Sequence, residues 1–162
     1  MKTMDEFMEH TIQDLYSAET QALEAMPQLA QRVQNKQLKQ AFEQHQQETQ
    51  QQVQRLEQIA QQMGIEVEGE TCQAMQGLIE EAQKLLGELE EGDLADAAII
   101  GAAQKMEHYE IACYGTARTL AQQAGQQQVA DLLEQTLQEE KATDEKLTQI
   151  ATSRVNEKAA QA

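Results

Sequence analysis

The sequence is poor in the residues that build β-sheets and disulfide-linked folds. Among 162 residues there are one Pro, eight Gly, three Tyr, two Phe and no Trp. The two cysteines, Cys72 and Cys113, form no Cys-x-x-Cys motif, so neither a disulfide framework nor a cysteine-rich zinc site is indicated. Ala, Leu, Gln, Glu and Met are abundant and favour helices. The composition therefore predicts an all-α chain in which both thiols are free and buried.

Basic residues are also scarce, because 12 Lys and Arg oppose 28 Asp and Glu, for a formal net charge of −16 at pH 7. Phosphate backbones and anionic membrane surfaces repel such a chain. No apolar run approaches the roughly 20 residues that a spanning helix needs. We therefore expect no nucleic acid and no membrane as partners. The first ten residues carry acids where a secretory signal needs an apolar stretch, which favours a reducing, cytoplasmic location.

Apolar residues recur at helical spacing over four long stretches and one short one. The long helices are expected over 5–33, 36–63, 94–123 and 127–152, and the short helix over 71–90, with Thr71 as its N-cap. Pro27 is expected to kink the first helix without ending it. We expect residues 1–152 to form one domain and residues 153–162 to form a flexible C-terminal tail.

Short turns join the first long helix to the second and the third to the fourth, so each pair is expected to be an antiparallel hairpin. About 30 residues separate the second and third long helices, which is enough to cross the length of the molecule. This long crossover would carry the extra short helix. The sequence therefore predicts a ferritin-like antiparallel four-helix bundle with one long crossover.

Acidic residues interrupt the apolar face of each long helix near its middle. Glu19 and Glu48 lie at similar distances from one hairpin turn, and Glu110 and Glu140 lie at equal distances from the other. Buried carboxylates are costly unless they are paired, protonated or bound to a cation, and basic partners are scarce on these faces. Oxygen ligands with one imidazole suit iron or manganese, so we predict two metal ions. The candidate ligands are Glu19, His45, Glu48, Glu107, Glu110, Glu140 and Asp144.

Several of these residues have an ordinary alternative. If all six acids ionise, the ligand charge of −6 is balanced by two ferric ions, but some of them could instead be protonated or reach solvent. His45 could be a core imidazole, and His108 is interpreted either as a neighbour of the ligands or as a contact between helices. Tyr16, Tyr109 and Tyr114 could pack in the core, or could hydrogen-bond the ligands or carry electrons.

Four segments, in order along the chain, carry a family resemblance. They are Asp-Leu-Tyr-Ser-Ala-Glu at 14–19, His-Gln-Gln-Glu-Thr at 45–49, Glu-His-Tyr-Glu at 107–110 and Glu-Glu-Lys-Ala-Thr-Asp at 139–144. Together they resemble the YciF/YciE-type ferritin-like proteins of bacteria, over nearly the whole chain. The resemblance implies a homodimeric, cytoplasmic, stress-associated protein with a di-iron centre.

Two helices depart from the wider ferritin-like pattern, in which each would carry Glu-x-x-His. The second long helix has His45-x-x-Glu48, in the reverse order, and the fourth has Glu140-x-x-x-Asp144 without a histidine. The ligand identities on these two helices are therefore the least determined by the resemblance.

Two functions fit the sequence. The first is a di-iron, or iron–manganese, protein that reacts with peroxide or oxygen during stress or handles iron; whether it turns over a substrate stays open. The second is a non-enzymatic dimeric bundle that acts through protein contacts. Iron storage in a large shell is disfavoured because no further packing helix is expected after Thr152, and protection of DNA is disfavoured by the charge.

Overall fold

The computed structural model describes residues 1–162, and the chain is all-α, as predicted. Its elements are α1 (Met4–Gln31), α2 (Lys36–Met63), α3 (Gln73–Gly87), α4 (Asp93–Gln123), α5 (Gln127–Ile150), a π-helical turn (Ala151–Val155) and α6 (Asn156–Ala159). None of these helices combines the length and the apolar character that a bilayer crossing requires.

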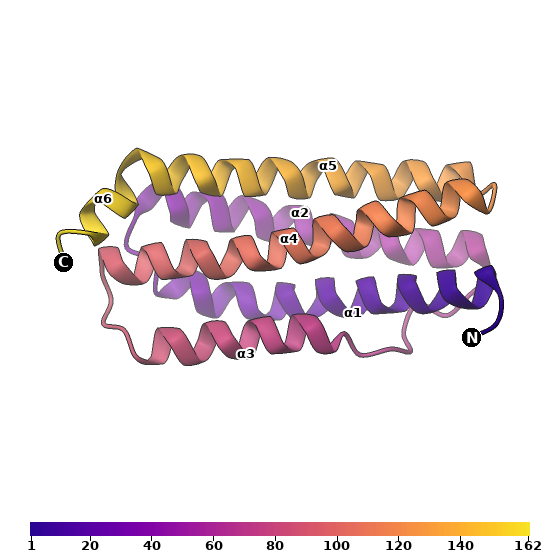
Figure 1. Cartoon of the computed structure of the whole chain (residues 1–162), viewed down its shortest axis with the longest axis horizontal. Coiled ribbons are helices and arrows are strands. Elements are labelled where there is room, and N and C mark those ends of the chain that lie inside the picture. Colours follow the sequence, from indigo (N-terminus) through magenta and orange to yellow (C-terminus); the bar gives the residue numbers. More distant parts are fainter.

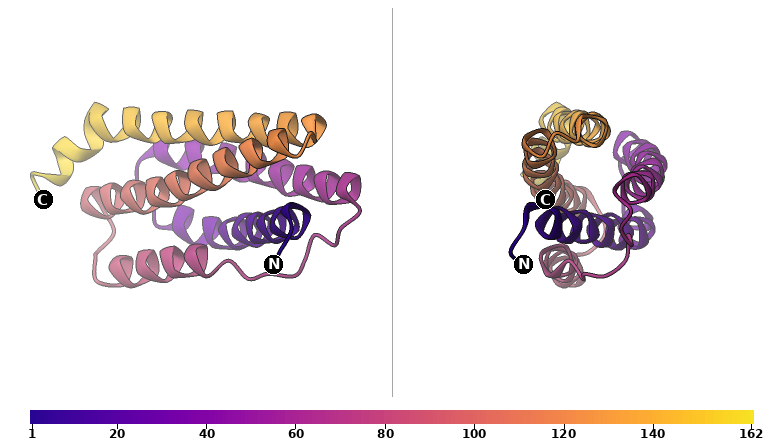
Figure 2. Two further views of the ribbon diagram at one scale, coloured as in Figure 1. Left: turned by 45° about the vertical axis from the view of Figure 1, so that its right-hand side comes forward. Right: turned by 90° about the vertical axis from the view of Figure 1, so that its right-hand side faces the viewer.

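The four long helices α1, α2, α4 and α5 lie side by side and surround a common interior (Figure 2). Sequential helices form two hairpins, α1 with α2 and α4 with α5, and the hairpins meet where α1 contacts α4 and α2 contacts α5. Because the chain returns along the molecule before α4 begins, α2 and α4 run in the same direction (Figure 1). The helix α3 packs on the outside against α1 and α4.

The ends of α2 and α3 have specific caps. Asn35 accepts hydrogen bonds from the backbone N–H groups of Gln37 and Leu38, which would otherwise have no partner at the start of α2. At the other end Gly64 has a φ of 69°, a left-handed conformation that glycine adopts without strain. The N-cap of α3 is Cys72, so the expected N-cap Thr71 was wrong by one residue.

A buried acid connects the two hairpins at one end of the molecule. Asp96 of α4 is 1% exposed, and its carboxylate accepts hydrogen bonds from the backbone N–H groups of Gln34 and Asn35 at 2.9 and 2.8 Å. These two residues belong to the turn between α1 and α2, which spans residues 32–35. The carboxylate therefore holds that turn against α4 and explains why Asp96 is buried without a basic partner.

The C-terminal segment differs from the expected tail. The chain stays helical through the π-helical turn and α6, to Ala159, and so beyond the expected boundary at Thr152. Val155 is 1% exposed because it packs into the same apolar core as Ile150 and Ala151. One apolar residue is a weak sequence signal, which is why the periodicity did not reveal this contact.

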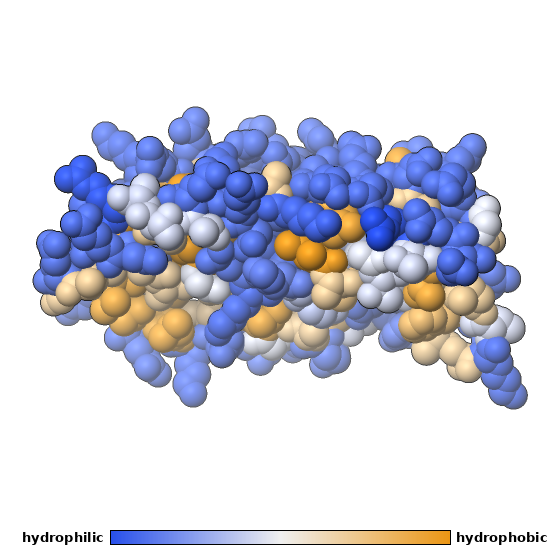
Figure 3. All heavy atoms as spheres, turned by 45° about the horizontal axis from the view of Figure 1, so that its top comes forward, coloured by the Kyte–Doolittle hydropathy of each residue, from blue (hydrophilic) through white to orange (hydrophobic).

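A layer of buried polar residues divides the core into two apolar clusters. The larger cluster holds 21 buried residues from α1 to the C-terminal turn, and the smaller holds 12. Along α1, Leu15 lies in the smaller cluster, Glu19 in the polar layer and Ala22 in the larger cluster. The outer surface over α5 is mainly hydrophilic, with small separate hydrophobic areas (Figure 3). The fold therefore encloses polar groups between two apolar regions.

Candidate metal centre

Five titratable side chains from four helices form the polar layer. Glu19 comes from α1, His45 from α2, Glu107 and Glu110 from α4, and Glu140 from α5. The four carboxyl groups are at most 2% exposed. Each lies three or four residues from a buried apolar residue on the same helix face, so the local periodicity turns it inward. The layer is therefore a direct result of acids placed within apolar stripes.

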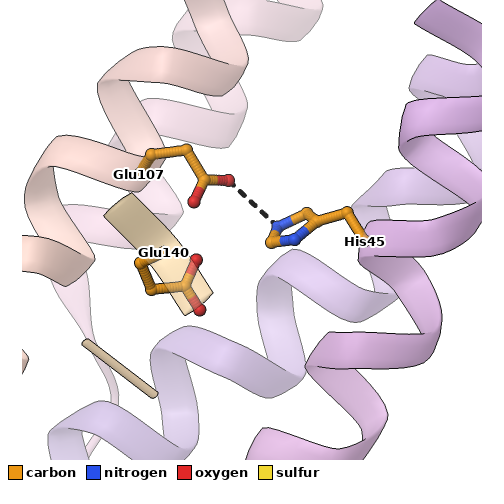
Figure 4. A group of neighbouring side chains, drawn as sticks. All are labelled: His45, Glu107 and Glu140. Carbon is orange, nitrogen blue, oxygen red and sulfur yellow. Dashed lines mark ion pairs between the residues drawn. The ribbon is translucent and has the colours of Figure 1, made fainter. Parts of the chain in front are cut away.

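Two overlapping groups of these side chains have ligand atoms close enough to share an ion. In the first group His45, Glu107 and Glu140 offer atoms that lie within 4.8 Å of one another (Figure 4), and in the second Glu19, Glu110 and Glu140 do the same. Glu140 belongs to both groups. If ions were bound at both groups, Glu140 would contribute to both sites.

Several oxygens of the cluster have no partner. The Nε2 atom of His45 lies 3.0 Å from Oε1 of Glu107, and the Tyr114 hydroxyl donates to Oε1 of Glu19 at 2.6 Å. Within the cluster, the buried atoms without a hydrogen bond are Oε2 of Glu107, Oε1 of Glu110 and both carboxylate oxygens of Glu140. Buried oxygens are normally paired, so four orphaned oxygens at one place fit cation ligands.

The pKa values of the cluster show which of these acids are unfavourable in their ionised form without a cation. Burial raises the pKa of Glu19 to about 7 from an ordinary 4.5. Burial and neighbouring carboxylates raise the pKa values of Glu110 and Glu140 well above the ordinary range. Burial acts the same way on Glu107, but the charge and hydrogen bond of His45 outweigh it and lower the Glu107 pKa. In turn, Glu107 overcomes the burial of His45 and raises the His45 pKa to about 10.

In the metal-free site His45 and Glu107 form an ion pair, and the raised pKa values of Glu19, Glu110 and Glu140 favour their protonated forms. Bound cations would replace these protons, and His45 would have to lose its own proton before it could bind a metal. Four ionised glutamates carry four negative charges, which two divalent cations balance. This donor set of carboxylates and one imidazole fits iron or manganese.

Two of the seven candidate ligands lie outside both groups. Glu48 is 30% exposed and accepts a hydrogen bond from Gln44, with one oxygen 3.9 Å from Nδ1 of His45. Asp144 pairs with His108, an Oδ1 to Nε2 distance of 3.2 Å. The inward positions next to these acids are taken by the buried residues Thr49 and Leu147. The rotation of α2 and α5 about their axes therefore places Glu48 and Asp144 beside the two groups and partly exposed.

A buried cation was missed by the sequence analysis. Arg55 of α2 is 8% exposed and donates to both carboxylate oxygens of Glu139 at 2.9 and 3.0 Å, and it also donates to the Thr136 hydroxyl. Gln52, which is fully buried, donates to the same carboxylate at 3.2 Å. Because Glu139 takes up this charge, Arg55 does not neutralise the acid cluster. The sequence signal that could have revealed Arg55 is its spacing of three residues from Gln52, which places both side chains on one face of α2.

The sequence leaves the role of Tyr114 open between core packing and hydrogen bonding to a ligand. The structure shows both, because the ring is fully buried in the smaller apolar cluster and its hydroxyl reaches Glu19. Burial and the Glu19 charge raise the Tyr114 pKa well above its ordinary value, so the hydroxyl stays a donor. It therefore holds the Glu19 carboxylate in position.

Known proteins are similar to this chain over nearly its whole length. A family model described as "Domain of unknown function (DUF892)" matches residues 3–160. Protein YciF of Escherichia coli K12 is 47% identical over 160 residues, which cover 98% of this chain and 96% of YciF.

Solved structures of similar proteins have similar folds over nearly the whole chain. The crystal structure of the E. coli stress protein YciF matches with a TM-score of 0.90 over 96% of this chain and 99% of that chain. YcfI from Rhodopseudomonas palustris matches with a TM-score of 0.89 and 38% identity, over 91% of this chain and 94% of that one. A protein from Xanthomonas campestris matches with a TM-score of 0.80 and 26% identity, over 98% and 97%. These matches confirm the resemblance inferred from the four segments, and the chain belongs to the DUF892 family of the E. coli stress protein YciF.

Proposed function

We propose that this chain is a ferritin-like four-helix bundle that holds two metal ions, with iron preferred and manganese as the alternative. The observation that carries the proposal is the pair of ligand groups that overlap at Glu140, with four buried carboxylate oxygens lacking a hydrogen-bond partner. The ferritin-like assignment is supported by two hairpins joined through a long connection that contains α3. The proposed ligands are Glu19, His45, Glu107, Glu110 and Glu140. Glu48 and Asp144 lie outside both ligand groups and are not among the proposed ligands.

Bound iron would supply redox chemistry and Lewis acidity toward peroxide or oxygen. The protein itself contributes a buried, preorganised set of carboxyl groups, because apolar clusters lie on both sides of the ligands and Tyr114 orients Glu19. Since its relative YciF is described as a stress protein, we place this chemistry in a stress response.

Metal binding to the purified protein tests the proposal. Anaerobic titration with ferrous iron, followed by removal of free ions and elemental analysis, should give two iron ions per chain. A ligand that binds only the folded state also stabilises it, by about 2.7 kcal/mol at a free concentration 100 times the Kd. The melting temperature should therefore rise with iron. Glu140→Gln should abolish most of this rise, because Glu140 belongs to both ligand groups.

The matched control is Glu145→Gln, which removes one exposed acid from the same helix and should bind iron as the wild type does. Only trace iron and manganese after reconstitution would refute the proposal. So would an equal thermal shift in wild type and Glu140→Gln, since the metal would then bind elsewhere.

The alternative is a non-enzymatic dimeric bundle that acts through protein contacts, and for YcfI a structural role has been suggested. It predicts no thermal shift with iron in either protein.

We also propose, from the family resemblance, that the protein is a homodimer in the cytoplasm. Light scattering on the purified protein should give twice the chain mass of 18.2 kDa. A monomer would refute the dimer.

A further inference from the structure

A second polar cluster lies outside the acid layer, where α1, the start of α3 and α4 meet. The Tyr109 hydroxyl donates to Oδ2 of Asp14 at 2.9 Å, and the same hydroxyl oxygen lies 2.9 Å from Sγ of Cys72. A phenol has a single hydrogen, and here Asp14 takes it. The thiol of Cys72 must therefore be the donor to the Tyr109 oxygen. The three groups form a directed chain from thiol to phenol to carboxylate.

The protein holds this chain firmly. The Cys72 side chain is fully buried and caps α3, so its sulfur also accepts the backbone N–H of Met75 at 3.5 Å. The backbone N–H of Cys72 donates to the Ser17 hydroxyl at 3.0 Å. Tyr109 lies on α4 between two of the proposed metal ligands, and Asp14 lines a groove on the surface. The cluster thus connects the helix that carries the acid layer with the outside.

Such a chain suits the transfer of one electron. A phenol that loses an electron becomes strongly acidic, so its proton must pass to an acceptor already in hydrogen-bond contact, which is the position of Asp14. The resulting phenoxyl radical can take a hydrogen atom from a thiol in contact, which is the position of Cys72. Neither a lone tyrosine nor a lone cysteine offers both steps.

We propose that Cys72, Tyr109 and Asp14 form a one-electron donor site that intercepts strong oxidants of the class derived from peroxide. In the first step the oxidant takes one electron from Tyr109, while the O–H bond breaks and the proton passes to Asp14. In the second step the S–H bond of Cys72 breaks, a new O–H bond forms on Tyr109, and a thiyl radical remains on Cys72. The oxidant has gained one electron, and Cys72 has lost one hydrogen atom.

In the metal-loaded protein this site would protect the acid layer from oxidants, and this use rests on the proposed function. The three groups themselves need no metal, so the test uses the metal-free protein in chelator. Photo-oxidised tris(bipyridine)ruthenium, generated with persulfate, is the one-electron oxidant, and rapid freezing followed by electron paramagnetic resonance detects tyrosyl radical. A negative result here would leave the iron titration unaffected, and the reverse also holds.

The wild type should show little tyrosyl signal, since the radical moves to Cys72. Cys72→Ser keeps a hydrogen-bonding and capping hydroxyl, but its O–H bond is too strong to give up a hydrogen atom. The tyrosyl signal should therefore rise several-fold in Cys72→Ser, and adding Tyr109→Phe should remove the rise. Asp14→Asn, introduced together with Cys72→Ser, should lower the signal, because an amide does not accept the proton.

Tyr16→Phe is the matched control and should behave as the wild type. A tyrosyl signal in Cys72→Ser equal to that of the wild type would overturn the proposal, as would a rise that survives Tyr109→Phe. Spin trapping with mass spectrometry gives a second measurement with Cys72 intact. The trapped adduct on Cys72 should fall several-fold in Tyr109→Phe, and an unchanged adduct would refute the relay even if the Cys72 variant failed to fold.

Discussion

Replacement of Glu19 by glutamine should make the stability of the metal-free protein less dependent on pH. The Glu19 side chain is 1% exposed, and its pKa is raised from 4.5 to about 7, chiefly by burial. A carboxyl group whose pKa is raised on folding contributes stability that is fully present below about pH 4.5 and is lost as the pH rises through about 7. Glutamine has the same shape and does not ionise, and its carbonyl oxygen can still accept from Tyr114.

The magnitude follows from the two pKa values. A change from 4.5 to about 7 corresponds to about 3 kcal/mol, at about 1.4 kcal/mol per pKa unit. Between about pH 4.5 and pH 8 the free energy of unfolding of the wild type should therefore fall by about 3 kcal/mol more than that of Glu19→Gln. The raised pKa of His45 also makes stability decline above its ordinary value of 6.5, but it does so in both proteins.

Urea unfolding followed by circular dichroism, in chelator and over this pH range, measures the difference. The control Glu145→Gln changes an exposed acid and should give a curve parallel to that of the wild type. Parallel curves for Glu19→Gln and the wild type would refute the reasoning, because the carboxyl group would then ionise equally in the folded and unfolded states.

Two further predictions concern buried hydrogen bonds. Asp96→Ala removes the acceptor of two backbone N–H groups in the turn before α2, so the free energy of unfolding, measured with urea at neutral pH, should fall by about 2–3 kcal/mol. The control is Asp131→Ala, at an exposed site. An equal or smaller loss in Asp96→Ala than in this control would contradict the role of the contact. Tyr114→Phe removes a hydrogen bond that favours the ionised form of Glu19, so carboxyl titration by NMR should give a higher Glu19 pKa in the variant, and an unchanged pKa would be inconsistent with the observed contact.

The helices could be predicted from the sequence because periodicity and cap residues act between neighbours in the chain. The prediction for 36–63 matches α2 in both bounds, since Asn35 and Gly64 are strong cap residues. The bounds of α3 and of the C-terminal helix were less accurate. Their ends depend on Cys72 and Val155, which are buried by residues distant in sequence.

The candidate site was predictable only to the level of helix faces. Glu19, Glu107, Glu110 and Glu140 follow from acids within apolar stripes, but the same rule also included Glu48 and Asp144. Residues three or four positions apart differ by about 40–60° around a helix axis, and this is enough to turn a side chain away from the interior. The rotation of each helix is decided by packing against its neighbours.

The sequence by itself determined the all-helical class, the order of the long helices and the height at which their acids meet, because hydrogen bonding and helix periodicity act between residues close in the chain. Only the tertiary structure decided that Glu140 joins two ligand groups, that Arg55 pairs with Glu139, and that Cys72, Tyr109 and Asp14 form one chain of hydrogen bonds. Tyr109 is separated from Asp14 by 95 positions and from Cys72 by 37. Such contacts depend on how whole helices rotate and slide against one another, and no local pattern records that choice.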